Sequence, residues 1–201
     1  RIMNKYQRFL FTAVFAVCSL AAFAQFGVGV RDNRFIYGDF TFLKHWEVSL
    51  EQSVFSEKPA YQYLRAYAGY KGEWKNLSYK GQAYFGAAYN GSYKSYGAKI
   101  GVNYRVVPRF YVKAILNPHH DSGYGYETCF LAGCGVVLTD NIDVIAAYTT
   151  IPEYRMSEKR LRGGFDFHVG KLSVIPEASI AVSGSSRAKT LRTVIGFRYD
   201  F

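Results

Sequence analysis

The chain has 201 residues, enough for one domain, and its 25 Lys and Arg residues outnumber its 15 Asp and Glu residues, giving a formal charge of +10. The basic residues are scattered along the chain. A nucleic-acid-binding protein would gather them in a run or patch, so the charge does not indicate that class. Aromatic residues make up 18% of the sequence, and no segment after the first 24 residues has helical periodicity. This composition favours an all-β protein.

The first 24 residues have the pattern of a cleaved secretory signal peptide. A short basic start precedes the uncharged stretch 9–22, and Ala22-Phe23-Ala24 forms a small-x-small cleavage site. The uncharged stretch is shorter than the ~20 residues that a membrane-spanning helix needs. We therefore expect a leader at 1–24 and a mature protein at 25–201.

From Phe26 onward, segments of alternating apolar and polar residues recur between turn residues, which predicts an up-and-down meander of antiparallel strands. The twelve predicted strands are residues 26–30, 35–43, 46–55, 61–70, 77–87, 93–104, 110–116, 126–138, 142–150, 161–169, 172–182 and 191–201. Ten strands are the alternative, because the segments on either side of Lys44 and His45 keep one parity and could form a single long strand.

The two faces of the predicted strands differ in character. One register carries no charge, as at Trp46, Val48 and Leu50, whereas the other mixes small, aromatic and charged side chains, as at Lys80 and Gln82. A soluble barrel or sandwich would also alternate, with its apolar face inward. The mixed register is more typical of a packed polar interior than of a solvent face, which favours a membrane barrel whose apolar register faces lipid.

The last segment, residues 191–201, ends on an aromatic residue and places Phe197, Tyr199 and Phe201 on one apolar face. Such a strand resembles the terminal strand of bacterial outer-membrane β-barrels, which the barrel-assembly machinery recognises as an insertion signal. The resemblance implies a closed, antiparallel, porin-like transmembrane β-barrel of about 12 strands in a Gram-negative outer membrane. It also implies that lipid and the assembly machinery are the partners, and we expect a monomer.

Connection lengths alternate along the chain, with longer ones such as 117–125 and 152–160 between shorter ones such as 139–141 and 170–171. In outer-membrane barrels short turns face the periplasm, which would place both termini there and make the strand number even. Pro176 lies inside a predicted strand. Because a closed barrel has no free edge for a proline, we expect a β-bulge there.

The most polar connection, 117–125, contains His119, His120, Asp121 and Ser122, which we predict to lie in an extracellular loop. These are the residue types of a nucleophilic hydrolase or acyltransferase, and enzymes that modify lipid A resemble this composition at the outer barrel rim. No family motif surrounds the serine. We therefore assign no catalytic residue and do not expect an enzyme.

Metal and disulfide signals are weak. His119 and His120 are adjacent and would point apart in an extended chain, so they do not make a metal pair. Cys129 and Cys134 would lie about 16 Å apart on opposite faces of an extended segment, too far to bridge without a bend. We expect no metal site and no cofactor.

The register that would face the barrel interior has more positive than negative charge. Its basic residues include Arg65, Lys80, Lys99, Lys113, Arg160, Arg162, Arg192 and Arg198. The last four lie near the carboxyl end and could form one basic ladder. In a low-dielectric pore such a field favours anions, which predicts a narrow, mildly anion-selective channel for small solutes or, by fold-level analogy, acidic oligosaccharides.

Two alternatives to a channel remain. In the first, interior acids neutralise these cations, side chains seal the barrel, and the 117–125 and 152–160 loops bind a partner. In the second, a lipid-modifying enzyme acts at the rim through the polar residues of the 117–125 loop.

Overall fold

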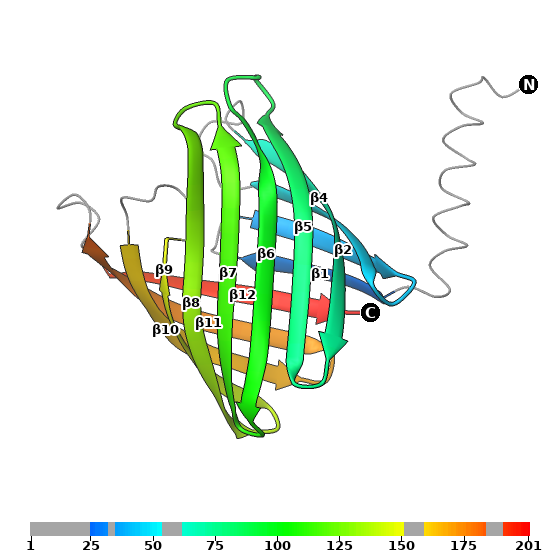
Figure 1. Ribbon diagram of the computed structural model, residues 1–201, viewed down its shortest axis with the longest axis vertical. Coiled ribbons are helices and arrows are strands. Elements are labelled where there is room, and N and C mark those ends of the chain that lie inside the picture. Colours follow the sequence, from blue (N-terminus) through cyan, green and yellow to red (C-terminus); the bar gives the residue numbers. More distant parts are fainter. Residues whose placement is uncertain (1–24, 32–34, 54–61, 151–158, 184–190) are drawn as a thin grey trace, which may run out of the picture.

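The computed structural model describes residues 25–31, 35–53, 62–150, 159–183 and 191–201, so the predicted signal peptide and most of the 152–160 connection lie outside the described residues. The described chain forms a single closed antiparallel barrel in which sequence neighbours pair and β1 pairs with β12 (Figure 1). Within it, no helix is long and apolar enough to cross a membrane.

The barrel has twelve strands, which confirms the predicted fold. They are β1 (Gln25–Arg31), β2 (Phe35–Phe42), β3 (Trp46–Ser53), β4 (Tyr63–Trp74), β5 (Leu77–Ala88), β6 (Lys94–Val107), β7 (Phe110–Asp121), β8 (Gly125–Thr139), β9 (Ile142–Thr149), β10 (Lys159–Val169), β11 (Leu172–Ser183) and β12 (Arg192–Asp200). The ten-strand alternative is wrong, because Leu43 and Lys44 have φ angles of 50° and 67° and turn the chain between β2 and β3.

The two ends of the barrel differ in their connections. The connections β2–β3, β4–β5, β6–β7, β8–β9 and β10–β11 have only two or three residues and lie at the end where β1 begins and β12 finishes. We call this the turn end and the opposite end the loop end. At the loop end the connections have three to nine residues, and the predicted long connection 117–125 has only three, so the predicted alternation of short and long connections holds in part.

The terminal strand closes the ring. β12 pairs with β1 from Gly27 opposite Asp200 to Val30 opposite Phe197, and the N–H of Phe201 donates to the carbonyl oxygen of Phe26 at 2.8 Å. The rings of Phe26 and Phe201 lie 5.3 Å apart. The aromatic residues of the predicted insertion signal all face outward and are exposed; they are Phe197, Tyr199 and Phe201.

The strands are unequal in length, so the barrel has a long wall. Strands β4 to β8 have 12 to 15 residues, whereas β1 to β3 have only seven or eight. In Figure 1 the long strands cross in front of β1, β2 and β10 to β12, which run across the rear. Strong coiling of a closed sheet produces this crossing.

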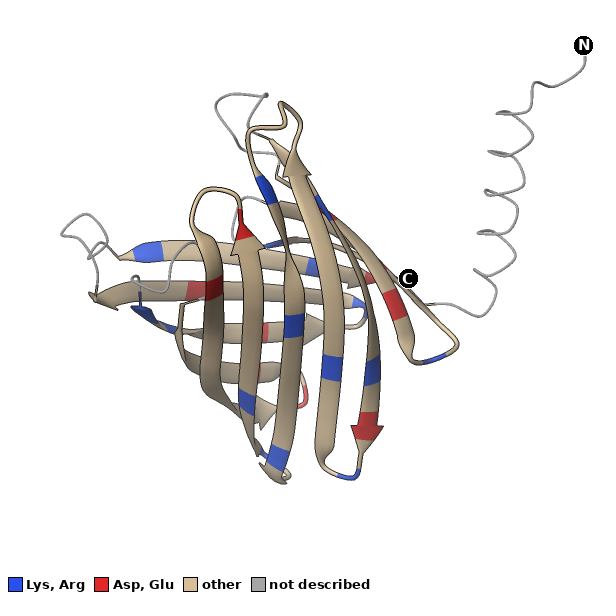
Figure 2. Cartoon of the chain, turned by 45° about the horizontal axis from the view of Figure 1, so that its top comes forward, with Lys and Arg blue, Asp and Glu red and all other residues tan. Residues whose placement is uncertain are grey.

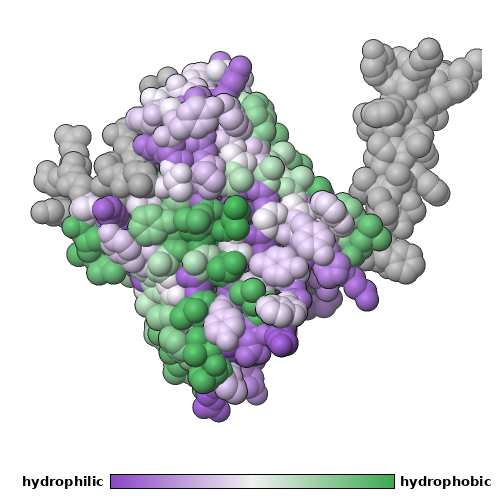
Figure 3. Space-filling view, viewed as in Figure 1, coloured by the Kyte–Doolittle hydropathy of each residue, from purple (hydrophilic) through white to green (hydrophobic). Residues whose placement is uncertain are grey.

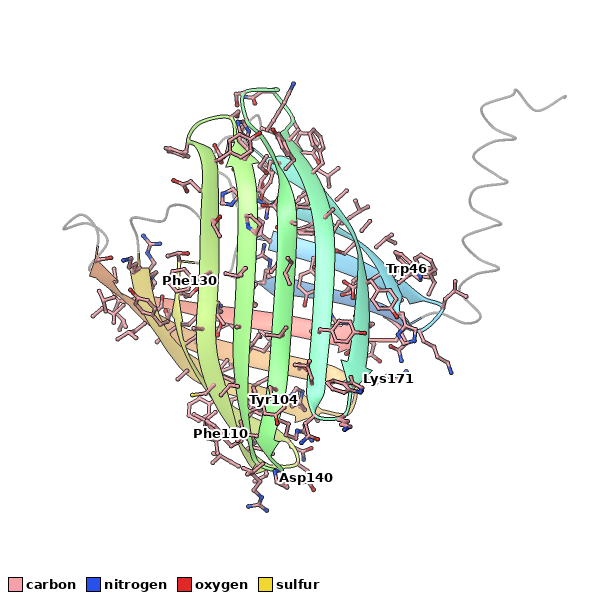
Figure 4. The ribbon with its side chains drawn as sticks, in the orientation of Figure 1. Trp46, Tyr104, Phe110, Phe130, Asp140 and Lys171 are labelled. Carbon is pink, nitrogen blue, oxygen red and sulfur yellow. The ribbon has the colours of Figure 1, made fainter. Side chains whose placement is uncertain are left out.

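The polarity of the barrel is the reverse of that in a soluble protein. Outward side chains are apolar and exposed, including Leu50 at 56% and Ile100 at 52%, whereas the buried residues include Glu47 and Glu51. Figure 3 shows apolar side chains gathered over the middle of the visible face, and Figure 4 shows Trp46 and other aromatic side chains extending from the wall. A surface of this kind fits a lipid bilayer.

The bulge expected at Pro176 is absent. β11 keeps one register with β10 on both sides of the proline, from Gly164 opposite Glu177 to Phe167 opposite Val174, and also keeps its register with β12. The shift in this pair of strands lies between Lys159 and Arg160 instead. The strand therefore passes through proline without an extra residue.

A glycine of the neighbouring strand lies against the backbone carbonyl of each mid-strand proline in the described chain. A Cβ added to Gly164 would lie 2.3 Å from the carbonyl oxygen of Pro176, and one added to Gly97 would lie 2.5 Å from that of Pro118. Only glycine permits such a close approach of two backbones. Gly69 lies equally close to the carbonyl oxygen of Gly81, so these close approaches are not confined to the prolines.

We expect Gly164→Ala to lower the free energy of unfolding by about 1–3 kcal/mol, because its methyl group would clash with a backbone carbonyl that cannot swing away. Urea unfolding in detergent micelles, followed by tryptophan fluorescence, measures the change. Gly81→Ala is the matched control, since a Cβ there has no neighbour within 4 Å, and it should change stability by less than about 0.5 kcal/mol. Equal unfolding midpoints for the two variants would contradict the expected clash.

Candidate functional site

Four lysines lie on the interior face of four neighbouring strands of the long wall. Lys71 of β4 is directly opposite Lys80 of β5, and Lys80 pairs in turn with Gly101 of β6. Lys99 on β6 and Lys113 on β7 lie within two residues of the same row. The four lysines, here called the lysine wall, span about 14 Å across the strands. Figure 2 shows blue segments close together on neighbouring strands of this wall.

Acidic residues are nearly absent from the strands of the lysine wall. β5 and β6 contain no Asp or Glu, and β7 contains one only at its last residue. At the β4 and β5 edge the counter-charge comes from Glu47 of β3, whose Oε1 lies 2.5 Å from Lys80 Nζ and whose Oε2 lies 3.9 Å from Lys71 Nζ. Asp166 and Glu177 line the second cavity together with Lys113 and lower the potential at the β7 edge. The wall is therefore most positive on β5 and β6, between these acids and Glu47.

Two cavities of the interior meet at this wall. A cavity of about 590 Å³ is lined by all four lysines and reaches Lys44 at the turn end. A second, of about 290 Å³, lies toward β10 and β11 and shares Lys99, Lys113 and Ile115 with the first. The larger volume is in the range of small-molecule sites. The interior therefore has room for solute beside its most basic surface.

A chain of ion pairs occupies the interior near the loop end of β1 to β4. Glu51 Oε2 lies 2.6 Å from Arg31 Nη2, and Glu51 Oε1 lies 3.7 Å from Arg65 Nη1. The Arg65 guanidinium also lies over the rings of Tyr63 and Tyr84, at 5.0 and 4.8 Å from their centroids. These charges pair with one another, and of the two arginines only Arg31 also lines the second cavity.

The arginines near the carboxyl end do not form the expected basic ladder. Arg198 pairs with Asp39 at 2.7 Å and lies six residues along β12 from Arg192, or about 20 Å. Arg162 forms an ion pair with Glu177, and Arg160 donates to Ser179. Acids and hydroxyls on neighbouring strands therefore interrupt the ladder. Of the predicted interior cations, Lys80, Lys99 and Lys113 belong to the lysine wall.

The polar segment 117–125 is mostly strand and not a loop. His119, His120 and Asp121 belong to β7, and only Ser122 of the four predicted loop residues lies in the turn. The loop prediction was wrong because a proline is usually taken to end a strand, whereas β7 continues through Pro118 to Asp121.

The rim side chains do not converge on one point. His120 faces outward and stacks on Tyr96 with ring centroids 5.0 Å apart. Asp121 is buried, and its Oδ1 accepts hydrogen bonds from the turn that follows. Ser122 Oγ accepts from the N–H of Lys94 at 2.9 Å. The hydrogen bonds of Asp121 and Ser122 support the turn.

Sequence reasoning missed Lys71. The predicted strand ended at residue 70, so Lys71 was assigned to a turn, although β4 continues to Trp74. The signal was available in the sequence, because Lys71 keeps the parity of Arg65 and Tyr67. Extending the alternation by two residues would have placed it inside the barrel.

We expect Glu51→Gln to lower the free energy of unfolding by about 3 kcal/mol, because it leaves Arg31 and Arg65 without their shared carboxylate in a largely buried site. Urea titration of the refolded barrel measures the effect. Glu73→Gln makes the same change at an exposed residue near the turn end and should cost less than about 0.5 kcal/mol. Similar losses for both variants would show that the ion-pair chain does not stabilise the barrel.

No protein-family model and no curated protein sequence matches the chain. Solved structures do match it. A KdgM porin in complex with disordered oligogalacturonate superposes with a TM-score of 0.62 at 10% sequence identity, over 89% of this chain and 98% of the porin. The NanC porin superposes with a TM-score of 0.51 at 8% identity, over 88% of this chain and 97% of the porin. The chain thus has the fold of small outer-membrane porins, as its terminal strand implied.

Proposed function

We propose that this protein is a narrow outer-membrane channel that favours small acidic solutes, with acidic oligosaccharides as the preferred class. The observation that carries the proposal is the lysine wall beside a cavity of about 590 Å³. A low-dielectric wall focuses the field of clustered charges into the space that they line. Anions therefore gain, and cations lose, electrostatic free energy on entering.

The spacing of the lysines suits a solute with several carboxylates. Neighbouring strands lie about 4.8 Å apart, so a chain of acidic sugar units could contact lysines on successive strands. Each contact is with a flexible point charge and not with a rigid bidentate fork. Several weak contacts in sequence allow a solute to enter and also to leave. The KdgM porin, solved with an oligogalacturonate, supports the same class of solute.

The proposal includes no catalytic step, in keeping with the dispersed rim residues. The apolar outer register would contact lipid, and the assembly machinery would recognise the outward aromatic residues of β12. We propose a monomer, since one chain closes the barrel by itself.

Single-channel conductance in a planar bilayer tests the channel, and a salt gradient reads its ion preference. We expect discrete steps that favour anions. Lys80→Glu and Lys113→Glu should each lower the anion-to-cation permeability ratio by at least about twofold, because they reverse a charge on the cavity wall. Lys75→Glu makes the same change in the β4–β5 turn and should leave the ratio unaltered.

Two outcomes would contradict the proposal in different ways. A correctly folded barrel, recognised by its heat-modifiable electrophoretic mobility, that gives no conductance would remove the channel and favour the sealed barrel. Conductance with equal permeability to both ions would keep the channel but remove its preference for acidic solutes.

We expect Glu47→Gln to raise the anion-to-cation permeability ratio, because Glu47 is the carboxylate that contacts Lys80 and Lys71. The amide keeps the size of the side chain while removing its charge. Reversal potentials in the same salt gradient measure the change. A lower ratio than in the unsubstituted protein would show that Glu47 does not offset the lysine wall.

A further inference from the structure

Three side chains with metal-ligating atoms converge inside the barrel toward its loop end. They are His119 of β7 and Glu127 and Cys129 of β8, and their ligand atoms all lie within 4.8 Å of one another. Strand pairing creates the cluster, since His119 is directly opposite Glu127 and Asn117 is opposite Cys129. Cys129 is fully buried, whereas His119 and Glu127 are partly exposed and offer a path of entry.

The histidine ring is held in the orientation of a metal ligand. His119 Nδ1 lies 3.0 Å from the backbone carbonyl oxygen of Asn117. A carbonyl only accepts, so Nδ1 carries the proton and Nε2 keeps its lone pair. This hydrogen bond is the usual outer contact of a metal-bound histidine. Tyr84 donates to the Asn117 side chain at 3.0 Å and helps to fix this residue.

We propose that His119, Glu127 and Cys129 form a site for Zn²⁺, with a fourth position open to water or to a donor atom of a solute. One thiolate, one imidazole and one carboxylate form a donor set that suits zinc. On coordination the Cys129 thiol loses its proton to solvent. Ligands of tetrahedral zinc lie about 3.5 Å from one another, so the cluster needs only a modest contraction.

The site adjoins the lysine wall. His119 of β7 pairs with Gly97 of β6, and Lys99 lies two residues beyond Gly97 on β6. A bound Zn²⁺ would cancel the negative charge of Glu127 at this end of the interior. With the Cys129 thiolate as a second anionic ligand the occupied site would be neutral, so the ion would remove a negative charge that opposes the lysine wall. The metal site does not depend on the proposed channel.

Titration of the refolded, untagged protein with Co²⁺ tests the site, because thiolate coordination produces a sulfur-to-cobalt charge-transfer absorption that Zn²⁺ then displaces. We expect this band in the unsubstituted protein and its loss in Cys129→Ser. Cys134→Ser removes the other cysteine of β8, which lies on the outward register, and should leave the band unchanged. A folded protein without the band, or a band that survives in Cys129→Ser, would overturn the proposal.

A second pair of variants separates coordination from damage to the fold. His119→Ala should weaken Zn²⁺ binding, measured by calorimetry, by at least about tenfold, whereas His120→Ala should leave it unchanged because that ring faces outward. Both variants must show the heat-modifiable mobility of the folded barrel. Equal Zn²⁺ affinities for folded His119→Ala and the unsubstituted protein would also overturn the proposal.

Discussion

Closure of the hydrogen-bonded ring is the constraint on which the rest of this structure depends. Hydrocarbon offers no partner to a backbone N–H or C=O group, so a sheet that spans a membrane cannot leave an edge unpaired. The pairing of β12 with β1 removes the last two edges, and Phe201 extends it by one further hydrogen bond to Phe26. Once the ring is closed, every strand has one lipid face and one interior face. The period of two in the sequence follows from that division.

This division places the charged side chains in the interior. Two parts of the barrel wall differ in how many acidic residues accompany the basic ones. On β1 to β4 and on β10 to β12, acids and arginines such as Glu51 and Arg65 or Asp39 and Arg198 neutralise one another. On β5 and β6 there is no acid at all, and the lysines there face a cavity. We infer that the first arrangement stabilises the barrel and the second leaves a field that acts on solutes.

The strand number and the two faces could be predicted from the sequence, because lipid enforces alternation along each strand. The strand ends could not, since outward positions near the rim need not be apolar, and Lys71 and His119 were assigned to connections for this reason. The bulge expected at Pro176 was wrong because β11 keeps its register with both neighbouring strands through the proline, and this register depends on strand pairing. Contacts such as Glu47 with Lys80, 33 residues apart, depend on registers that neither strand specifies alone.

Sites inside such a barrel are assembled across strands and not along them. Each strand contributes every second residue, and neighbours in a site come from adjacent strands at paired positions. The lysine wall draws one residue from each of four strands, and His119 meets Glu127 only because β7 pairs with β8 in one register. Such a site therefore has no motif of closely spaced residues in the sequence. A chain can therefore share a barrel with porins at 10% identity while its interior chemistry has to be derived from its own pairing registers.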